Sequence, residues 1–315
     1  MASLLDVRIL KRLTDSLKEL NQHRPLKPST LKKLRDQMSV EMTYHSNAIE
    51  GNRLTLKETL LVLREGVTVK GKNLQEHLEA KNHEEAMNFL FQIVDSKKTL
   101  QISHHLIRQL HQLVVKDTES KIAGTYRKTD VQISGSQHRP PPGYQVHHQM
   151  NKFIEWLNKN KKKFHPVEFA ALAHHRFVAT HPFEDGNGRT GRLLMNLLLM
   201  RSSYPIAIIQ KNDRSKYYQA LDQADSGKNQ AIVRIVAQAV ERTLNIYLKA
   251  VIKSSPQTDL LRLSDIANQT EFSAKYLNLL ARKGILKAQK EGRNWLSSLK
   301  AVEDYKKARL RKRGE

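Results

Sequence analysis

The twelve residues from 181 to 192, HPFEDGNGRTGR, limit the fold of this chain more than any other segment. They lie between two stretches, 167–180 and 188–201, whose apolar residues recur at helical spacing. Pro182 cannot continue the first helix, and two glycines then permit a tight turn with exposed backbone N–H groups. The segment therefore predicts a helix, a tight loop and a second helix whose start is an anion-binding site.

The side chains of this segment suit a phosphate chain. Arg189 and Arg192 are three residues apart on the first turn of the second helix, so both guanidinium groups can reach one polyphosphate. Asp185 is a candidate magnesium ligand, since magnesium binds one or two carboxylates together with phosphate oxygens. His181 can accept a proton near neutral pH. Each residue alone would be ordinary, but together they predict a nucleotide-binding catalytic centre.

Most of the remaining sequence also has helical periodicity, for example residues 104–116, 150–160 and 229–252. The segment 134–144 holds three of the nine prolines and two glycines and is expected to be a loop. Just before it, Val131-Gln-Ile-Ser134 alternates apolar and polar residues, as a short edge strand does. We therefore expect a mainly α-helical body that carries one strand-and-loop projection.

A break in the pattern at residues 253–258, KSSPQT, divides the chain. With 315 residues, the sequence is long enough for one large and one small domain, which we expect at 1–252 and 258–315.

The second domain begins with two short helices, which we expect at 264–270 and 273–282 with Ser264 and Ser273 as N-caps. Two alternating runs around Glu291-Gly292 then suggest a hairpin, and a basic helix follows at 301–313. This order resembles a winged helix-turn-helix.

The net charge and the composition indicate which kinds of binding partner suit this chain. The formal net charge of +23 attracts polyanions, and residues 258–315 contain 14 Lys/Arg against 7 Asp/Glu. DNA binding by this domain and a role in protein contacts or homodimer formation therefore both stay open. The absence of cysteine excludes disulfides and thiolate metal sites. No apolar run has the length of a membrane span or signal peptide, so we expect a cytoplasmic protein without membrane contact.

The segment 181–192 matches HPFx[DE]GNGRxxR, the motif of the Fic family, at every specified position. The resemblance extends over about residues 40–250, including GTYRKTDVQI at 124–133 and YYQALDQADSG at 217–227, and is particularly similar to the animal endoplasmic-reticulum Fic enzymes. It implies an all-α Fic fold with a short β-hairpin flap and a catalytic core at about 100–250. The implied activity is transfer of AMP from ATP to Ser, Thr or Tyr hydroxyls of target proteins that dock on the flap.

The resemblance also implies residue roles. His181 deprotonates the hydroxyl, Asp185 holds Mg²⁺ on the α- and β-phosphates of ATP, and the two arginines take the β- and γ-phosphates. Relatives commonly have Asn at the position of Asp225, which leaves its contact with the base open. The residues placed against ATP are Glu50, Val131, Gln132, Ile133, Ser134, Gly186, Asn187, Gly188, Arg189, Thr190, Gly191, Arg192, Tyr217, Tyr218 and Asp225.

An inhibitory motif, [ST]xxxE[GN], is matched by Ser46 to Gly51. Ser46 and Glu50 are four residues apart and so share one helix face. By the resemblance, Glu50 pairs with Arg192 and displaces the γ-phosphate, because one buried arginine cannot pair bidentately with a carboxylate and a phosphate together. Some relatives also use this glutamate to orient water for removal of AMP.

Two function classes follow. The first is a protein adenylyltransferase that is inhibited by its own Glu50. The alternative is a DNA-binding transcriptional regulator whose Fic domain senses nucleotide.

Overall fold

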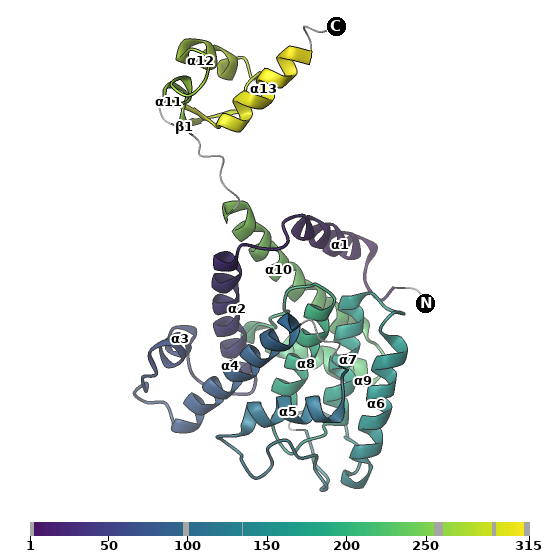
Figure 1. Ribbon diagram of the computed structural model, residues 1–315. Helices are drawn as coiled ribbons and strands as arrows, with labels where there is room; N and C mark the ends of the chain where they lie inside the picture. Colours follow the sequence, from purple (N-terminus) through teal and green to yellow (C-terminus); the bar gives the residue numbers. More distant parts are fainter. Residues whose placement is uncertain (1–2, 97–100, 134, 255–260, 292–293, 312–315) are drawn as a thin grey trace. The chain divides into compact units, whose positions relative to one another are not determined.

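The computed structural model of the protein describes residues 3–96, 101–133, 135–254, 261–291 and 294–311 (Figure 1). The chain divides into two compact units, Met1–Leu248 and Lys249–Glu315, and each is described here by itself. No helix within the described ranges has the length and apolar character needed to cross a bilayer.

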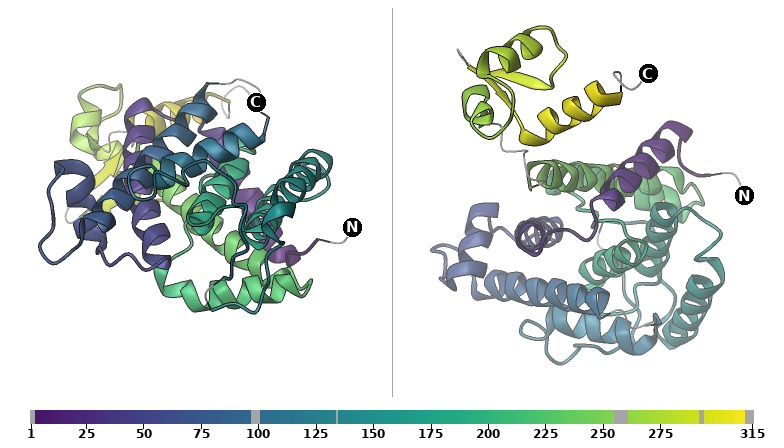
Figure 2. Two further views of the ribbon diagram at one scale, coloured as in Figure 1. Left: turned by 90° about the horizontal axis from the view of Figure 1, so that it is seen from below. Right: turned by 45° about the horizontal axis from the view of Figure 1, so that its top comes forward.

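The first unit is built from helices around one central helix (Figures 1 and 2). Twelve residues of α8 (Asn187–Arg201) are buried, and α8 packs against α7, α5, α4 and α2. A helix that is buried on nearly all sides must be apolar almost throughout, as RLLMNLLLM is. The other helices of this unit are α1 (Val7–Gln22), α2 (Pro28–Ile49), α3 (Leu56–Glu65), α4 (Leu74–Asp95), α5 (His104–Val115), α6 (Val146–Asn160), α7 (Pro166–Thr180), α9 (Arg214–Asp225) and α10 (Gln230–Ser254), with short 3₁₀ turns at Gly143–Gln145 and Lys211–Asp213.

Local sequence fixes where several of these helices begin. Thr55 and Asn73 each form a capping box with the glutamate three residues later, at the starts of α3 and α4. Pro28 and Pro166 occupy the first turns of α2 and α7, where a missing N–H costs nothing. The mainly helical fold predicted from the sequence is confirmed.

The predicted edge strand in the flap is wrong. Residues 131–133 form no strand, and Ser134 lies outside the described residues. Alternating residues become a strand only where a second strand pairs with them, and no described strand pairs with residues 131–133. Side chains hold the flap a few residues further along the chain. Ser136 Oγ donates to Asp222 Oδ1 at 3.0 Å, and His138 Nε2 donates to the carbonyl of Ala179 at 2.8 Å.

The second unit combines short helices with a three-stranded antiparallel sheet of order β1-β3-β2. Its elements are β1 (Leu261–Arg262), α11 (Leu263–Ala267), α12 (Ala274–Arg282), β2 (Ala288–Glu291), β3 (Asn294–Ser297) and α13 (Leu299–Arg311). Ser273 caps α12 through the N–H of Tyr276, as predicted. Ser264 does not cap α11, because the helix already begins at Leu263 and the hydroxyl of Ser264 bonds Asp265 instead. The two-residue β1 was missed, since it is too short to show a pattern.

Candidate active site

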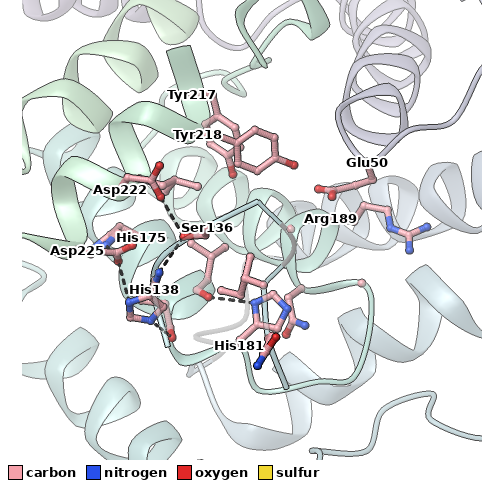
Figure 3. A pocket seen from close by; sticks show the side chains of 18 of the residues that line it. Glu50, Ser136, His138, His175, His181, Arg189, Tyr217, Tyr218, Asp222 and Asp225 are labelled. Carbon is pink, nitrogen blue, oxygen red and sulfur yellow. Dashed lines mark hydrogen bonds and ion pairs between the residues drawn. The ribbon is translucent and has the colours of Figure 1, made fainter. Parts of the chain in front are cut away.

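A cavity of about 400 Å³ opens beside the start of α8 (Figure 3). Residues from five separate parts of the first unit line it, so the fold gathers groups that are far apart in the sequence. Of the predicted residues, the lining includes His181, Asp185, Gly186, Asn187, Gly188, Arg189, Glu50, Gln132, Ile133, Tyr217, Tyr218 and Asp225. Three others, Thr190, Gly191 and Arg192, are buried within α8 behind this surface. Val131 is half-buried and is not part of the lining.

The loop between α7 and α8 is held in shape by its own side chains. His181 ends α7 in the left-handed region, with φ of 47°, and Gly186 precedes α8 with φ of 74°. Asn187 Oδ1 accepts the N–H of Phe183 at 2.9 Å, and its Nδ2 donates to the carbonyl of Phe183 at 2.8 Å. The amide of Asn187 therefore closes the loop, so a cradle for an anion at this position rests on the backbone.

His111 supports the same loop from α5, and sequence reasoning missed it. Its ring stacks on Phe183 with centroids 3.6 Å apart. Its Nδ1 accepts the N–H of Gly124 at 2.9 Å, so its Nε2 carries the proton and donates to the carbonyl of Asp185 at 3.0 Å. Burial lowers the pKa of His111 to about 4, which keeps the ring neutral. Nothing in the local sequence distinguishes this histidine from the other 13.

His181 has the orientation of a proton acceptor. Its Nδ1 lies 3.3 Å from the carbonyl of Val178, and a carbonyl only accepts, so Nδ1 carries the proton and Nε2 the lone pair. Burial lowers the pKa of His181 below its ordinary value, although the Val178 carbonyl opposes this. The ring is therefore neutral at physiological pH.

Arg127 fixes the backbone on which His181 is carried. Its Nε donates to the carbonyl of His181 and its Nη2 to that of Pro141, both at 2.7 Å, and its own N–H donates to the carbonyl of Pro182. Arg127 is 3% exposed, so these contacts replace water. It ties the flap to the catalytic loop, a role that sequence reasoning missed.

Arg189 and Arg192, the two arginines near the start of α8, are paired with carboxylates. Arg189 Nη2 donates to Asp185 Oδ2 at 2.9 Å, and its Nη1 lies 3.5 Å from Glu79 Oε1. The side chain of Asp185 is 58% exposed, whereas that of Arg189 is 4% exposed. A positive charge thus lies just beneath the surface of the cavity, next to an accessible carboxylate.

Arg192 is fully buried and bonded to the end of α2. Its Nε donates to Ser46 Oγ at 3.0 Å, and its Nη2 donates to the carbonyl of Ser46 and to Glu50 Oε1, both at 2.8 Å. Burial acts to lower the pKa of Arg192, but the Glu50 carboxylate and neighbouring groups raise it above its ordinary value. Its Nη1 is buried without a hydrogen-bond partner among the described atoms, which leaves one donor unused.

Glu50 lies directly against the first turn of α8. A Cβ added to Gly188 would collide with Glu50 Oε1 and would crowd Arg192 Nη1. Gly188 is therefore required for this approach. The carboxylate therefore lies against the helix start at which the sequence predicts an anion site.

Tyr217, Tyr218 and Asp225 also line the cavity. Tyr217 is buried, and its hydroxyl bonds His174 Nε2 at 2.7 Å. Asp225 Oδ1 accepts from His175 Nε2 at 2.8 Å. Figure 3 shows Asp225 on the opposite side of the cavity from Glu50 and Arg189. Lining residues that the sequence did not indicate are Ser136, His138, His175, Val178, Ala179, Arg214, Leu221 and Asp222.

Within the ranges that the structure describes, no three or more His, Asp or Glu side chains are grouped as metal ligands. Asp185, the predicted ligand, thus stands as a single accessible carboxylate beside the predicted phosphate-binding turn.

Comparisons with known proteins agree with this geometry. The Fic/DOC family model matches residues 101–199. A curated relative, "Protein adenylyltransferase Fic" of Nematostella vectensis, is 42% identical over 206 residues, which are 65% of this chain and 48% of that protein. The chain thus spans about half the length of the curated relatives it matches.

Among solved structures, Fic-1 (residues 134–508) of C. elegans is 33% identical with a TM-score of 0.71, covering 79% of this chain and 73% of that one. A Fic-domain signalling protein from Bacteroides thetaiotaomicron is 30% identical with a TM-score of 0.70, and the match covers 79% of this chain and all of that one.

Proposed function

Because this chain belongs to the Fic/DOC family, we propose that it transfers AMP from ATP to Ser, Thr or Tyr hydroxyls of target proteins and of itself. The observation that carries the proposal is the contact of the Glu50 carboxylate with Arg192 at the start of α8. A carboxylate held there stands in for a phosphate group, which marks the position where a polyphosphate binds. The curated relatives bear the name of this activity.

The phosphate end of the cavity supplies the charge that the reaction needs. The free N–H groups at the start of α8 and the guanidinium of Arg189 face this end, and Arg192 lies beneath it with an unused donor. Held donors of this kind stabilise charge on the phosphoryl group with no reorganisation during the reaction. The part of the cavity that Tyr217, Tyr218 and Asp225 line then takes the nucleoside.

The transfer follows from the orientation of His181. The target hydroxyl oxygen attacks the α-phosphorus in line, its proton passes to Nε2 of His181, and the bond to the bridging oxygen of the β-phosphate breaks. Pyrophosphate leaves. Since Nδ1 bonds the Val178 carbonyl, Nε2 is the nitrogen that holds the lone pair for this step.

The residues present fit Mg²⁺. Asp185 offers one accessible carboxylate next to the phosphate end, and magnesium commonly binds one or two carboxylates, substrate phosphates and water rather than a cage of protein ligands. Bound there, the ion would neutralise phosphate charge. Asp185 would hold it, and the backbone of 186–188 would orient the phosphates.

Target proteins would dock on the flap. Gln132 and Ile133 line the cavity, and residues 131–133 are not part of any described strand, so their backbone groups suit pairing with an extended segment. Ser134, also predicted here, lies outside the described residues. A cytoplasmic location stays a prediction from the sequence.

Glu50→Gly tests the proposal. Loss of the carboxylate frees Arg192 for the γ-phosphate, so self-labelling with ATP and magnesium should rise by at least about tenfold. Intact-mass spectrometry would detect AMP adducts and fragmentation would name the modified hydroxyl. Glu119→Gly, an exposed glutamate outside the cavity, is the matched control and should label as the unchanged chain does. Equal labelling of the Glu50→Gly and Glu119→Gly proteins would contradict autoinhibition.

The same site could also remove AMP, with Glu50 orienting the attacking water. If so, the unchanged chain should release AMP from a modified target and the Glu50→Gly protein should not. Chromatography of the released nucleotide distinguishes removal of AMP from transfer of AMP.

A second candidate function, DNA binding, is favoured by the exposed face of α12. Lys275 and Arg282 are exposed there, and Lys287 and Lys290 are exposed beside and within β2. Positive side chains on the second helix and on a hairpin neutralise phosphates. The full chain should therefore shift random duplex DNA at about 50 mM salt and release it as salt rises. No shift at low salt would instead favour protein contacts or a homodimer, which light scattering would detect.

A further inference from the structure

Glu79 lies where the phosphate site meets the inhibitory segment, by which we mean residues 46–52. It is on α4, which packs against both α2 and α8. Its Oε1 is 3.5 Å from Arg189 Nη1, and its Oε2 accepts from Asn52 Nδ2 at 2.7 Å. One carboxylate, 16% exposed, thus contacts both a phosphate-facing arginine and the inhibitory segment.

The contact with the inhibitory segment is reinforced on both sides. Asn47 Nδ2 donates to the backbone carbonyl of Glu79 at 3.3 Å. Asn52 Nδ2 also donates to the carbonyl of Glu76 at 3.0 Å, and Asn52 Oδ1 accepts the N–H of Leu54. Glu50 lies between the two asparagines, so α4 fixes the chain on either side of the inhibitory carboxylate.

Arg189 depends on Glu79 most when nucleotide is bound. Its two carboxylate contacts are with Asp185 and Glu79. With magnesium bound, Asp185 would hold the ion, and Glu79 would be left to balance the charge of Arg189 and to hold its guanidinium plane. A nearly buried guanidinium whose charge is unbalanced would lose its fixed position.

We propose that Glu79 is a positioning residue that sets Arg189 for the polyphosphate and at the same time fastens the inhibitory segment through Asn52. This inference rests on the proposed nucleotide site. Because one side chain serves both, a change in Glu79 alters phosphate affinity and inhibition together, whereas a change in Asn52 alters inhibition alone.

The first measurement is the affinity for ATP with magnesium, by titration calorimetry in the Glu50→Gly background. Glu79→Gln, which keeps the shape and removes the charge, should weaken binding by about tenfold. Asn52→Ala, the matched control, removes the other contact of the same carboxylate and should leave the affinity unchanged. Glu79→Asp keeps the charge and should restore part of the loss. Unchanged affinity in Glu79→Gln, or an equal loss in Asn52→Ala, overturns the inference.

The second measurement is amide hydrogen exchange of the inhibitory segment with Glu50 in place and no nucleotide present. Glu79→Gln and Asn52→Ala should both accelerate exchange there, while exchange in α5 stays the same. Acceleration throughout the unit would indicate general loosening and would overturn the inference. If the Glu50→Gly protein binds ATP but transfers no AMP, the proposed function fails and this inference is still decided by the two measurements.

Discussion

The two units of this chain differ in the kinds of side chain that they bury. The first encloses charged and polar side chains among its apolar core, including Arg189, Arg192, His83 and His174. The core of the second is apolar, and its buried polar residues, among those described, are Ser297 and Ser298. A buried charge is costly unless it is paired. The polar interior of the first unit is therefore retained for its site, whereas the second needs only a core to support a basic surface.

The arginines show how the first unit offsets that cost. Ser46 and Glu50 satisfy most donors of Arg192, and Asp185 and Glu79 balance Arg189. The pairing partner of Arg192 is also its proposed inhibitor, so one contact would provide both stability and inhibition. The following predictions test this division between a polar, catalytic unit and an apolar, supporting one.

The largest effect should come from His181→Ala. In the Glu50→Gly background, removing the proton acceptor should lower AMP transfer by about 10³-fold, since general-base catalysis commonly contributes 10²–10⁴. The initial rate of adduct formation measures it. His105→Ala, an exposed histidine on α5, should transfer at the parent rate. A His181→Ala protein that keeps its rate would mean that the polar interior of the first unit is not catalytic.

Acid should destabilise the first unit selectively. His83 and His174 are fully buried, and burial lowers their pKa values from 6.5 to about 3. Below pH 6.5 the unfolded chain binds protons that the folded one does not, so stability falls as pH falls towards 3. At pH 5, each of these two histidines should lower the free energy of unfolding by about 2 kcal/mol, and both together by about 4 kcal/mol.

Calorimetry at pH 7 and pH 5 measures this loss. Residues 249–315 contain no histidine, so the transition of the second unit should move much less. Equal shifts of both transitions would remove the difference between the two interiors.

Leu277→Ala should lower the thermal stability of the second unit alone. Leu277 is fully buried in the apolar core of this unit. The cavity that the substitution leaves should lower the free energy of unfolding by about 3 kcal/mol. The thermal transition of this unit should fall while AMP transfer by the Glu50→Gly protein stays the same. Leu279→Ala, on the same helix but 46% exposed, should leave the transition nearly unmoved. Loss of transfer in Leu277→Ala would show that the first unit depends on the second.

The local features of the site could be predicted because they depend on neighbours in the sequence. Pro182, Gly186 and Gly188 dictate a loop and a helix start wherever they occur between helical segments. Asn187 lines the cavity, but its amide closes the loop instead of facing a ligand. The strand at 131–133 was wrong because pairing is decided by a partner that this segment does not have in the described chain.

The sequence by itself determined the helix periods, the tight loop of residues 181–192 and the helix start at its end, since steric limits and backbone hydrogen bonding act over a few residues. The pairing of Arg192 with Glu50, 142 residues away, was expected from the family resemblance, but only the tertiary structure decided that Arg127, His111 and Glu79 support the site. An arginine, a histidine or a glutamate becomes buried and paired only when the packing of other helices removes its water, and that packing has no local signal.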